Sequence, residues 1–82
     1  MPKVSFPPPA MFVRSLISAK RGDRIVYFEG DLAYSRWEEA QRKERTLARF
    51  ANAVYQSAKD GHCTLVQKKL KLNKYQYIAV KL

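Results

Sequence analysis

The sequence is poor in the residues that cross-link small proteins. It holds one cysteine, one histidine and three glycines in 82 residues. A lone cysteine forms no disulfide within the chain, and one cysteine with one histidine is too small a set for a structural zinc site. A chain of this size without such cross-links is typical of a reducing compartment. We therefore expect a cytoplasmic protein that holds no metal and no cofactor.

Long apolar runs and catalytic motifs are missing as well. No stretch approaches the roughly 18 consecutive apolar residues of a membrane span. Prolines and Arg14 interrupt the first residues, MPKVSFPPPAMFVRSL, unlike the apolar run of a signal peptide. The chain has no phosphate-binding loop, and His62 has no serine or cysteine with a plausible orienting acid nearby in the sequence, although distant residues could converge. We expect neither an enzyme nor a membrane protein, and no small-molecule substrate.

Acidic residues are the scarce charged class. Sixteen Lys and Arg stand against seven Asp and Glu, the net charge is +9 at pH 7, and no acid follows Asp60. In one small domain this excess indicates an anionic partner, either nucleic acid, an acidic membrane surface or an acidic protein. The apolar fraction of 46% is ordinary for a folded chain. We expect an N-terminal arm over residues 1–9 and a single domain over 10–82.

The first half of the chain is predicted to form a helix, a strand and a second helix. Apolar residues recur at helical spacing over 10–20, and Pro9 suits the first helical position. The β-branched and aromatic run RIVYF, residues 24–28, favours a strand. Either Asp31 or Ser35 is suited to cap the helix that follows.

Residues 37–59 contain no glycine or proline and allow one long helix or two shorter ones. The charged block QRKER, residues 41–45, interrupts the apolar stripe. We therefore favour two helices, the second beginning near Thr46. Trp37 is expected to anchor the core or a contact between helices rather than to stack on a ligand.

The last twenty residues are predicted to form a hairpin. Residues 63–70 and 75–82 alternate apolar and polar side chains, and Asn73 suits a left-handed position in the turn between them. Ile78 is expected to meet Leu65 in the core.

The predicted element order is helix, strand, helix, helix, strand, strand. Packed together, these elements would form an α+β domain with three helices on a three-stranded antiparallel sheet. The order, with the segments GHCTLVQKKL and YQYIAV, resembles the compact winged helix-turn-helix proteins of bacteria and their phages. The resemblance implies that the terminal hairpin is the wing and that the helix before it, residues 45–59, lies in the major groove of DNA.

The second long helix is predicted to carry a polar face without any acid. The residues expected to face the core are Leu47, Ala48, Ala51, Val54, Tyr55 and Ala58. The opposite face holds Arg45, Arg49, Asn52, Gln56 and Lys59. Arginine pairs with guanine, asparagine and glutamine pair with adenine, and lysine reaches phosphates. A merely solvated helix face is the alternative, and the lack of acid favours DNA contact.

The hairpin, over residues 68–77, carries the densest positive charge of the chain. Its lysines are Lys68, Lys69, Lys71 and Lys74. Lysines on an exposed hairpin also discourage strand pairing between molecules, but one or two would be enough for that. Four lysines without an acid favour contact with phosphates.

These patterns lead to two functional hypotheses. The first is a DNA-binding winged-helix protein, a small transcriptional regulator whose partner is double-stranded DNA. The second is a protein-interaction module with a basic surface, such as a phage-type inhibitor or an assembly subunit, or a homodimer. Its apolar anchor would come from Trp37, Tyr34, Phe6 and Met11. RNA binding shares the charge argument but lacks a recognition motif.

Overall fold

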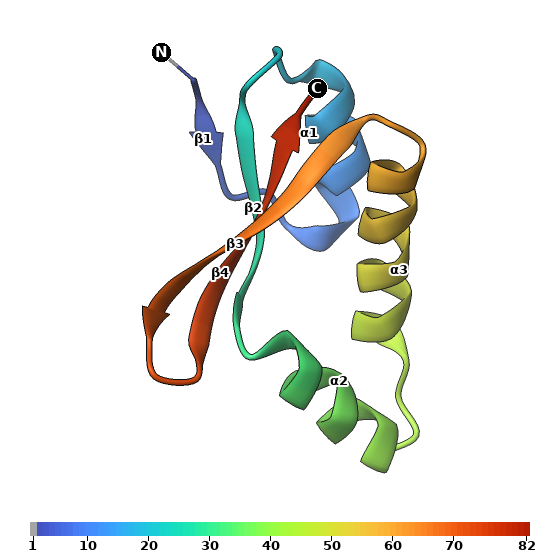
Figure 1. Ribbon diagram of the computed structural model, residues 1–82. Coiled ribbons are helices and arrows are strands. Elements are labelled where there is room, and N and C mark those ends of the chain that lie inside the picture. Colours follow the sequence, from blue (N-terminus) through green and yellow to red (C-terminus); the bar gives the residue numbers. More distant parts are fainter. Residues whose placement is uncertain (1) are drawn as a thin grey trace.

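Three α-helices and a mixed four-stranded sheet make up the fold of residues 2–82, which the computed structural model describes (Figure 1). In chain order the elements are β1 (Val4–Ser5), a 3-10 helix η1 (Pro9–Met11), α1 (Phe12–Ser18), β2 (Arg24–Gly30), α2 (Leu32–Gln41), α3 (Thr46–Lys59), β3 (Cys63–Lys71) and β4 (Lys74–Lys81). The sheet order is β1-β2-β4-β3. The α+β class is therefore confirmed.

The sheet differs from the prediction in its number of strands and in their directions. The expected antiparallel pairs β2–β4 and β3–β4 are present, but β1 adds a fourth strand that runs parallel to β2. β1 lies within the predicted arm of residues 1–9, of which Met1 is outside the described residues. The prediction missed β1 because a strand of two residues beside three prolines has almost no pattern of its own.

The Asp23 carboxylate ties β1 to the domain. It accepts hydrogen bonds from the backbone N–H groups of Lys3, at 3.0 Å, and Lys20, at 2.9 Å. Both bonds favour the ionised form, so they lower the pKa of Asp23 below its ordinary value. The next residue, Arg24, donates its backbone N–H to the Lys3 carbonyl at 2.8 Å.

The helical segment after β2 is divided into two helices, as predicted. Asp31 caps α2, and its side chain accepts the backbone N–H of Tyr34 at 3.0 Å; Ser35 lies inside the helix. α2 ends at Gln41, and Lys43 adopts a φ of 59°, which breaks the helical path. α3 then begins at Thr46.

The predicted hairpin is confirmed, with Asn73 at a φ of 58° in its turn. The predicted contact between Ile78 and Leu65 is wrong. Leu65 pairs with Ala79, whereas Ile78 pairs with Val66 on the opposite face of the sheet. Ile78 and Ala79 are both buried although they lie on opposite faces of β4. The alternation of side chains along the strand therefore did not show which face of the sheet meets the helices.

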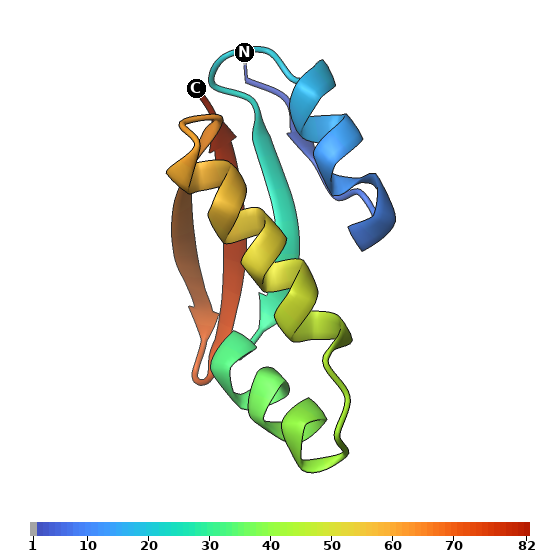
Figure 2. The same cartoon turned by 90° about the vertical axis from the view of Figure 1, so that its right-hand side faces the viewer.

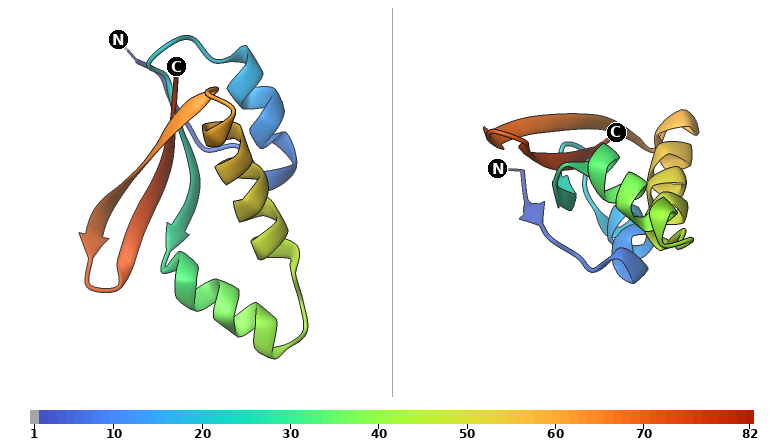
Figure 3. Two further views of the ribbon diagram at one scale, coloured as in Figure 1. Left: turned by 45° about the vertical axis from the view of Figure 1, so that its right-hand side comes forward. Right: turned by 90° about the horizontal axis from the view of Figure 1, so that it is seen from below.

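The helices lie on one side of the sheet (Figure 3). The buried cluster between them and the sheet consists of Phe12, Leu16, Ile25, Val54, Cys63 and Ala79. The Phe12 ring meets the rings of Tyr27 and Phe50 edge to face, at centroid distances of 5.9 and 5.8 Å. Burial in this cluster raises the pKa of Tyr27 to about 12.

α3 and α2 relate differently to this core (Figure 2). α3 crosses the face of the sheet and buries Val54, whereas α2 has no buried residue and extends beyond the end of the sheet. The core positions expected for Tyr55 and Trp37 are wrong, since Tyr55 is 61% exposed and Trp37 is 56% exposed. No helix within residues 2–82 combines the length and the apolar character needed to cross a membrane.

Candidate nucleic-acid interface

The predicted polar face of α3 is exposed over its whole length. Its members are Arg45, Arg49, Asn52, Gln56 and Lys59. Because Val54 and the half-buried Phe50 hold the opposite face against the core, these side chains point away from the sheet. The structure therefore brings the five predicted residues together on one surface.

The two ends of this face differ in their contacts. At the C-terminal end, the Gln56 side-chain amide donates to Asp60 at 2.9 Å, and the Lys59 ammonium lies 6.0 Å from the centroid of the Tyr55 ring. Within residues 2–82, the side chains of Arg49 and Asn52 form no hydrogen bond. The N-terminal half of the face is therefore the half that is free to bind a ligand.

A groove of about 740 Å³ lies between α2 and this half of α3. Its lining residues are Arg36, Trp37, Ala40, Lys43, Glu44, Arg45, Ala48, Arg49 and Asn52. Four of them are basic and one is acidic, so the groove favours an anionic ligand. Sequence reasoning missed Arg36 and Lys43, although Arg36, Ala40 and Lys43 follow one another at helical spacing.

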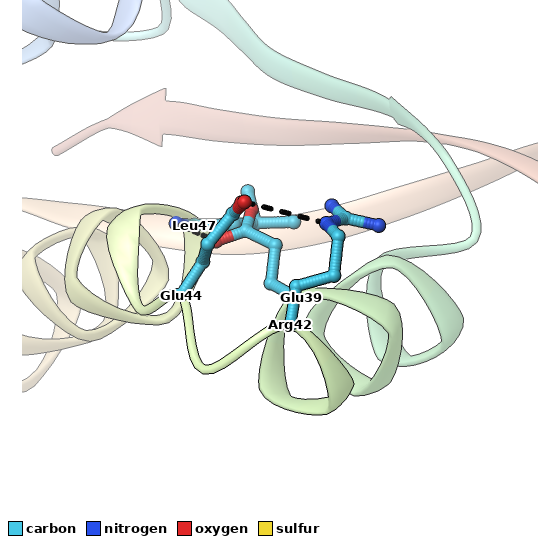
Figure 4. A network of polar contacts seen from close by, with 4 residues as sticks. All are labelled: Glu39, Arg42, Glu44 and Leu47. Atoms are coloured by element: carbon cyan, nitrogen blue, oxygen red, sulfur yellow. Dashed lines mark hydrogen bonds and ion pairs between the residues drawn. The ribbon is translucent and has the colours of Figure 1, made fainter.

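Two carboxylates lie at the junction of α2 and α3: Glu39 on α2 and Glu44 in the linker between the two helices (Figure 4). Glu39 reaches across and accepts the backbone N–H of Leu47 in the first turn of α3 at 2.9 Å, while Glu44 pairs with Arg42 at 3.4 Å. The α3 N-cap residue, Arg45, provides no side-chain cap of its own. Glu39 therefore satisfies a free helix N–H and also joins the two walls of the groove.

The start of α2 is joined to the sheet. The backbone N–H of Leu32 donates to the Tyr77 hydroxyl at 3.1 Å. Tyr77 lies on β4, opposite Phe28 and Gln67. One polar contact thus holds α2 near the hairpin strand, and a second, from Glu39, holds its other end near α3.

Most of the scarce acids are engaged in such contacts. The carboxylates that accept hydrogen bonds within residues 2–82 are those of Asp23, Asp31, Glu39, Glu44 and Asp60. Within the same residues, Arg42 is the one basic side chain in an ion pair with an acid. None of the four basic side chains that line the groove forms an ion pair with an acid of the described residues.

The hairpin lysines do not share one face. Lys68 lies opposite Gln76 and Lys69 lies opposite Tyr75, so their side chains emerge on the two sides of the sheet. Lys71 lies directly opposite Lys74, which is half-buried. Like charges directly opposite each other across an antiparallel pair are destabilising. An anion bound at the turn would relieve that repulsion.

α2, which forms one wall of the groove, and the hairpin turn lie toward the same end of the molecule, away from β1 and from the C-terminus (Figure 1). α3 and the hairpin turn, in contrast, lie on opposite sides of the molecule (Figure 3). A straight ligand lying along the whole face of α3 would therefore not reach the turn. A ligand that crosses the end of the molecule beside α2 would reach both the groove and the hairpin turn.

Within residues 2–82, no group of histidine, cysteine, aspartate and glutamate side chains is arranged to hold a metal ion. Comparisons of the chain with protein-family models, curated proteins and solved structures found no match.

Proposed function

We propose that the protein binds double-stranded DNA as a small transcriptional regulator of the winged-helix type. The observation that carries the proposal is the basic groove in which Arg45, Arg49 and Asn52 of the α3 face meet Arg36 and Lys43 across from them. In helix-turn-helix proteins the N-terminal residues of the second helix contact base edges while the first helix crosses the backbone. α2 and α3 would take these two roles.

In this arrangement the DNA crosses the end of the molecule that holds α2 and the hairpin turn. Arg49 and Asn52 would read bases, since a guanidinium suits guanine and a carboxamide suits adenine. Lys71 and Lys74 would contact phosphates as the wing, and the repulsion between them would fall when they do so. Gln56 and Lys59 lie farther along α3 and would contribute less than the sequence pattern suggests.

The salt dependence of duplex binding tests the proposal. Each neutralised phosphate adds about −0.9 to the slope of log affinity against log salt. The double variant Lys71→Gln/Lys74→Gln should therefore flatten the slope by roughly two units. The matched control is Lys20→Gln/Arg21→Gln, which removes the same charge from exposed positions outside both the groove and the hairpin. Equal slopes for the two double variants would contradict a specific role of the wing.

Base reading by α3 has its own test. On a site selected from random duplexes, Arg49→Ala and Asn52→Ala should each cost about 1–3 kcal/mol of binding free energy. Binding to unrelated duplexes should change less, because those contacts are made to phosphates. If both variants bind every duplex as the wild type does, the α3 face is ordinary surface.

A protein partner is the second candidate, and one observation favours it. The four apolar side chains expected to form its anchor are exposed, at 63% for Phe6, 37% for Met11, 56% for Tyr34 and 56% for Trp37. An interaction module predicts weak duplex binding that does not depend on the hairpin lysines. It also predicts that Trp37→Ala abolishes a protein complex, because buried aromatic residues carry much of the energy of such interfaces.

A further inference from the structure

The exposed tryptophan of α2 is not used by a continuous duplex in the proposed arrangement. Trp37 is 56% exposed and lines the groove, although it carries one of the largest apolar surfaces of the chain. Tyr34 is also 56% exposed, and the centroids of the Tyr34 and Trp37 rings lie 5.8 Å apart with an interplanar angle of 33°. Exposing two neighbouring aromatic rings to water forfeits the stabilisation that their burial would give. A ligand that covers them would recover it.

The groove around Trp37 combines this aromatic surface with cations. Arg36 is the neighbour of Trp37 in sequence, and Lys43 and Arg45 come from the linker at the end of α2. A positively charged groove with an aromatic side chain is the combination that binds single-stranded nucleic acid, since the base stacks on the ring while its phosphate meets the cations. A volume of about 740 Å³ is within the range of small-ligand sites, which is roughly 300–1,000 Å³.

We infer that the α2–α3 groove takes an unpaired nucleotide, so that the preferred ligand is DNA with a single-stranded overhang rather than a continuous duplex. The inference rests on the proposed function and adds to it the form of DNA that is bound. The base would stack on Trp37, and its phosphate would lie among Arg36, Lys43 and Arg45. The adjoining duplex would extend toward the hairpin turn, which lies at the same end of the molecule (Figure 1).

The other aromatic side chains fit this role less well. Tyr75 and Tyr77 are half-buried and pack against each other, with ring centroids 6.3 Å apart. Tyr55 is 61% exposed, but its ring lies under the Lys59 ammonium and outside the groove. Only Trp37 presents an exposed aromatic surface together with the cations of the groove within the described residues.

The chain provides its own probe, because Trp37 is its single tryptophan. Two DNA hairpins of the same duplex sequence are titrated into the protein, one blunt and one with a short thymine overhang, while Trp37 fluorescence is followed. The overhang should quench the fluorescence and bind about 5- to 150-fold more tightly than the blunt end, as expected for one stacked base. Blunt DNA should quench the fluorescence less, because it offers no unpaired base to stack on the ring.

Variants separate stacking from general effects on the fold. Trp37→Leu should reduce the ratio of overhang to blunt affinity to near one, whereas Trp37→Phe, which keeps a ring, should retain most of the preference. These variants are compared by the anisotropy of labelled DNA, since they lack the tryptophan. Tyr55→Leu removes an equally exposed aromatic side chain outside the groove and should keep the preference. Circular dichroism confirms that each variant is folded.

The outcomes are distinguishable from those of the proposed function. If the wild type binds both DNA forms equally, or if Tyr55→Leu loses the preference as Trp37→Leu does, the unpaired nucleotide is refuted while duplex binding stands. If the wild type binds neither form, the proposed function fails as well. A preference that disappears with Trp37→Leu alone supports the inference.

Discussion

The two walls of the groove are held in place by different kinds of interaction. α3 buries Val54 and packs Phe50 against the core, whereas α2 has no fully buried residue and is joined to the sheet through Tyr77 and to α3 through Glu39. Hydrophobic contacts are numerous and cumulative, but single hydrogen bonds near the surface contribute little each. α3 is therefore the fixed wall, and the position of α2 depends on a few polar groups.

The largest expected difference is between an aromatic side chain of α1 that packs against α3 and an aromatic side chain of α2. Phe12 is 1% exposed and contacts Phe50 of α3, so Phe12→Ala should cost about 3–5 kcal/mol of unfolding free energy. Trp37→Ala, on α2, should change the unfolding free energy by no more than about 0.5 kcal/mol, because the side chain is largely exposed. Urea unfolding followed by circular dichroism measures both.

The contrast holds even if Phe12→Ala leaves too little stability to measure. Phe12→Leu retains part of the volume and should give a smaller loss that is still well above that of Trp37→Ala. Equal losses for the two aromatic deletions would mean that α2 is part of the core and would remove the distinction between the two walls.

A smaller effect is expected at the junction of the helices. Glu39→Ala removes the carboxylate that accepts the Leu47 N–H, and loss of such a helix cap costs about 0.5–2 kcal/mol. Glu38→Ala, one position earlier on α2, is the matched control. Amide hydrogen exchange should become faster at Leu47 in the first variant and not in the second. Protection of Leu47 that survives Glu39→Ala would assign the junction to packing instead.

The smallest effect is expected at β1, which, like α2, is held by polar contacts. The pKa of Asp23 is lowered in the folded state by the Lys3 and Lys20 N–H groups, so its contribution is present above its unfolded pKa, near 3.8. That contribution is lost as the pH falls through the lower folded value. Wild-type stability should therefore decline below about pH 4 more steeply than that of Asp23→Asn. Parallel pH curves between the two proteins would show that the carboxylate does not anchor β1.

The elements with a strong local signal were predictable from the sequence. Asn73 marked the turn of the hairpin, Pro9 marked the start of the first helical segment, and the charged block before Thr46 marked the break between α2 and α3. Each signal acts over a few residues, because backbone preference and local hydrogen bonding decide it. β1 has no such signal, since it depends on a carboxylate that follows it by some twenty residues in the chain.

The candidate site was predictable only in part. The exposed face of α3 followed from helical periodicity, as far as Arg45, Arg49 and Asn52 are concerned. The groove did not, because it depends on the angle between two helices, which the contact of Glu39 with Leu47 helps to set. Trp37 was expected in a packed position, because large aromatic side chains are usually buried, but it is 56% exposed.

The position of Cys63 has a consequence for following the motions of this protein. Cys63, the first residue of β3, is 2% exposed, and burial raises the pKa of its thiol. Thiol reagents attack the exposed thiolate, so the folded chain should react slowly and each labelling event should report an opening of the core. The rate of modification then reports the opening of the core around Cys63. The molecule thus carries a native reporter for the opening of its core, without an added label.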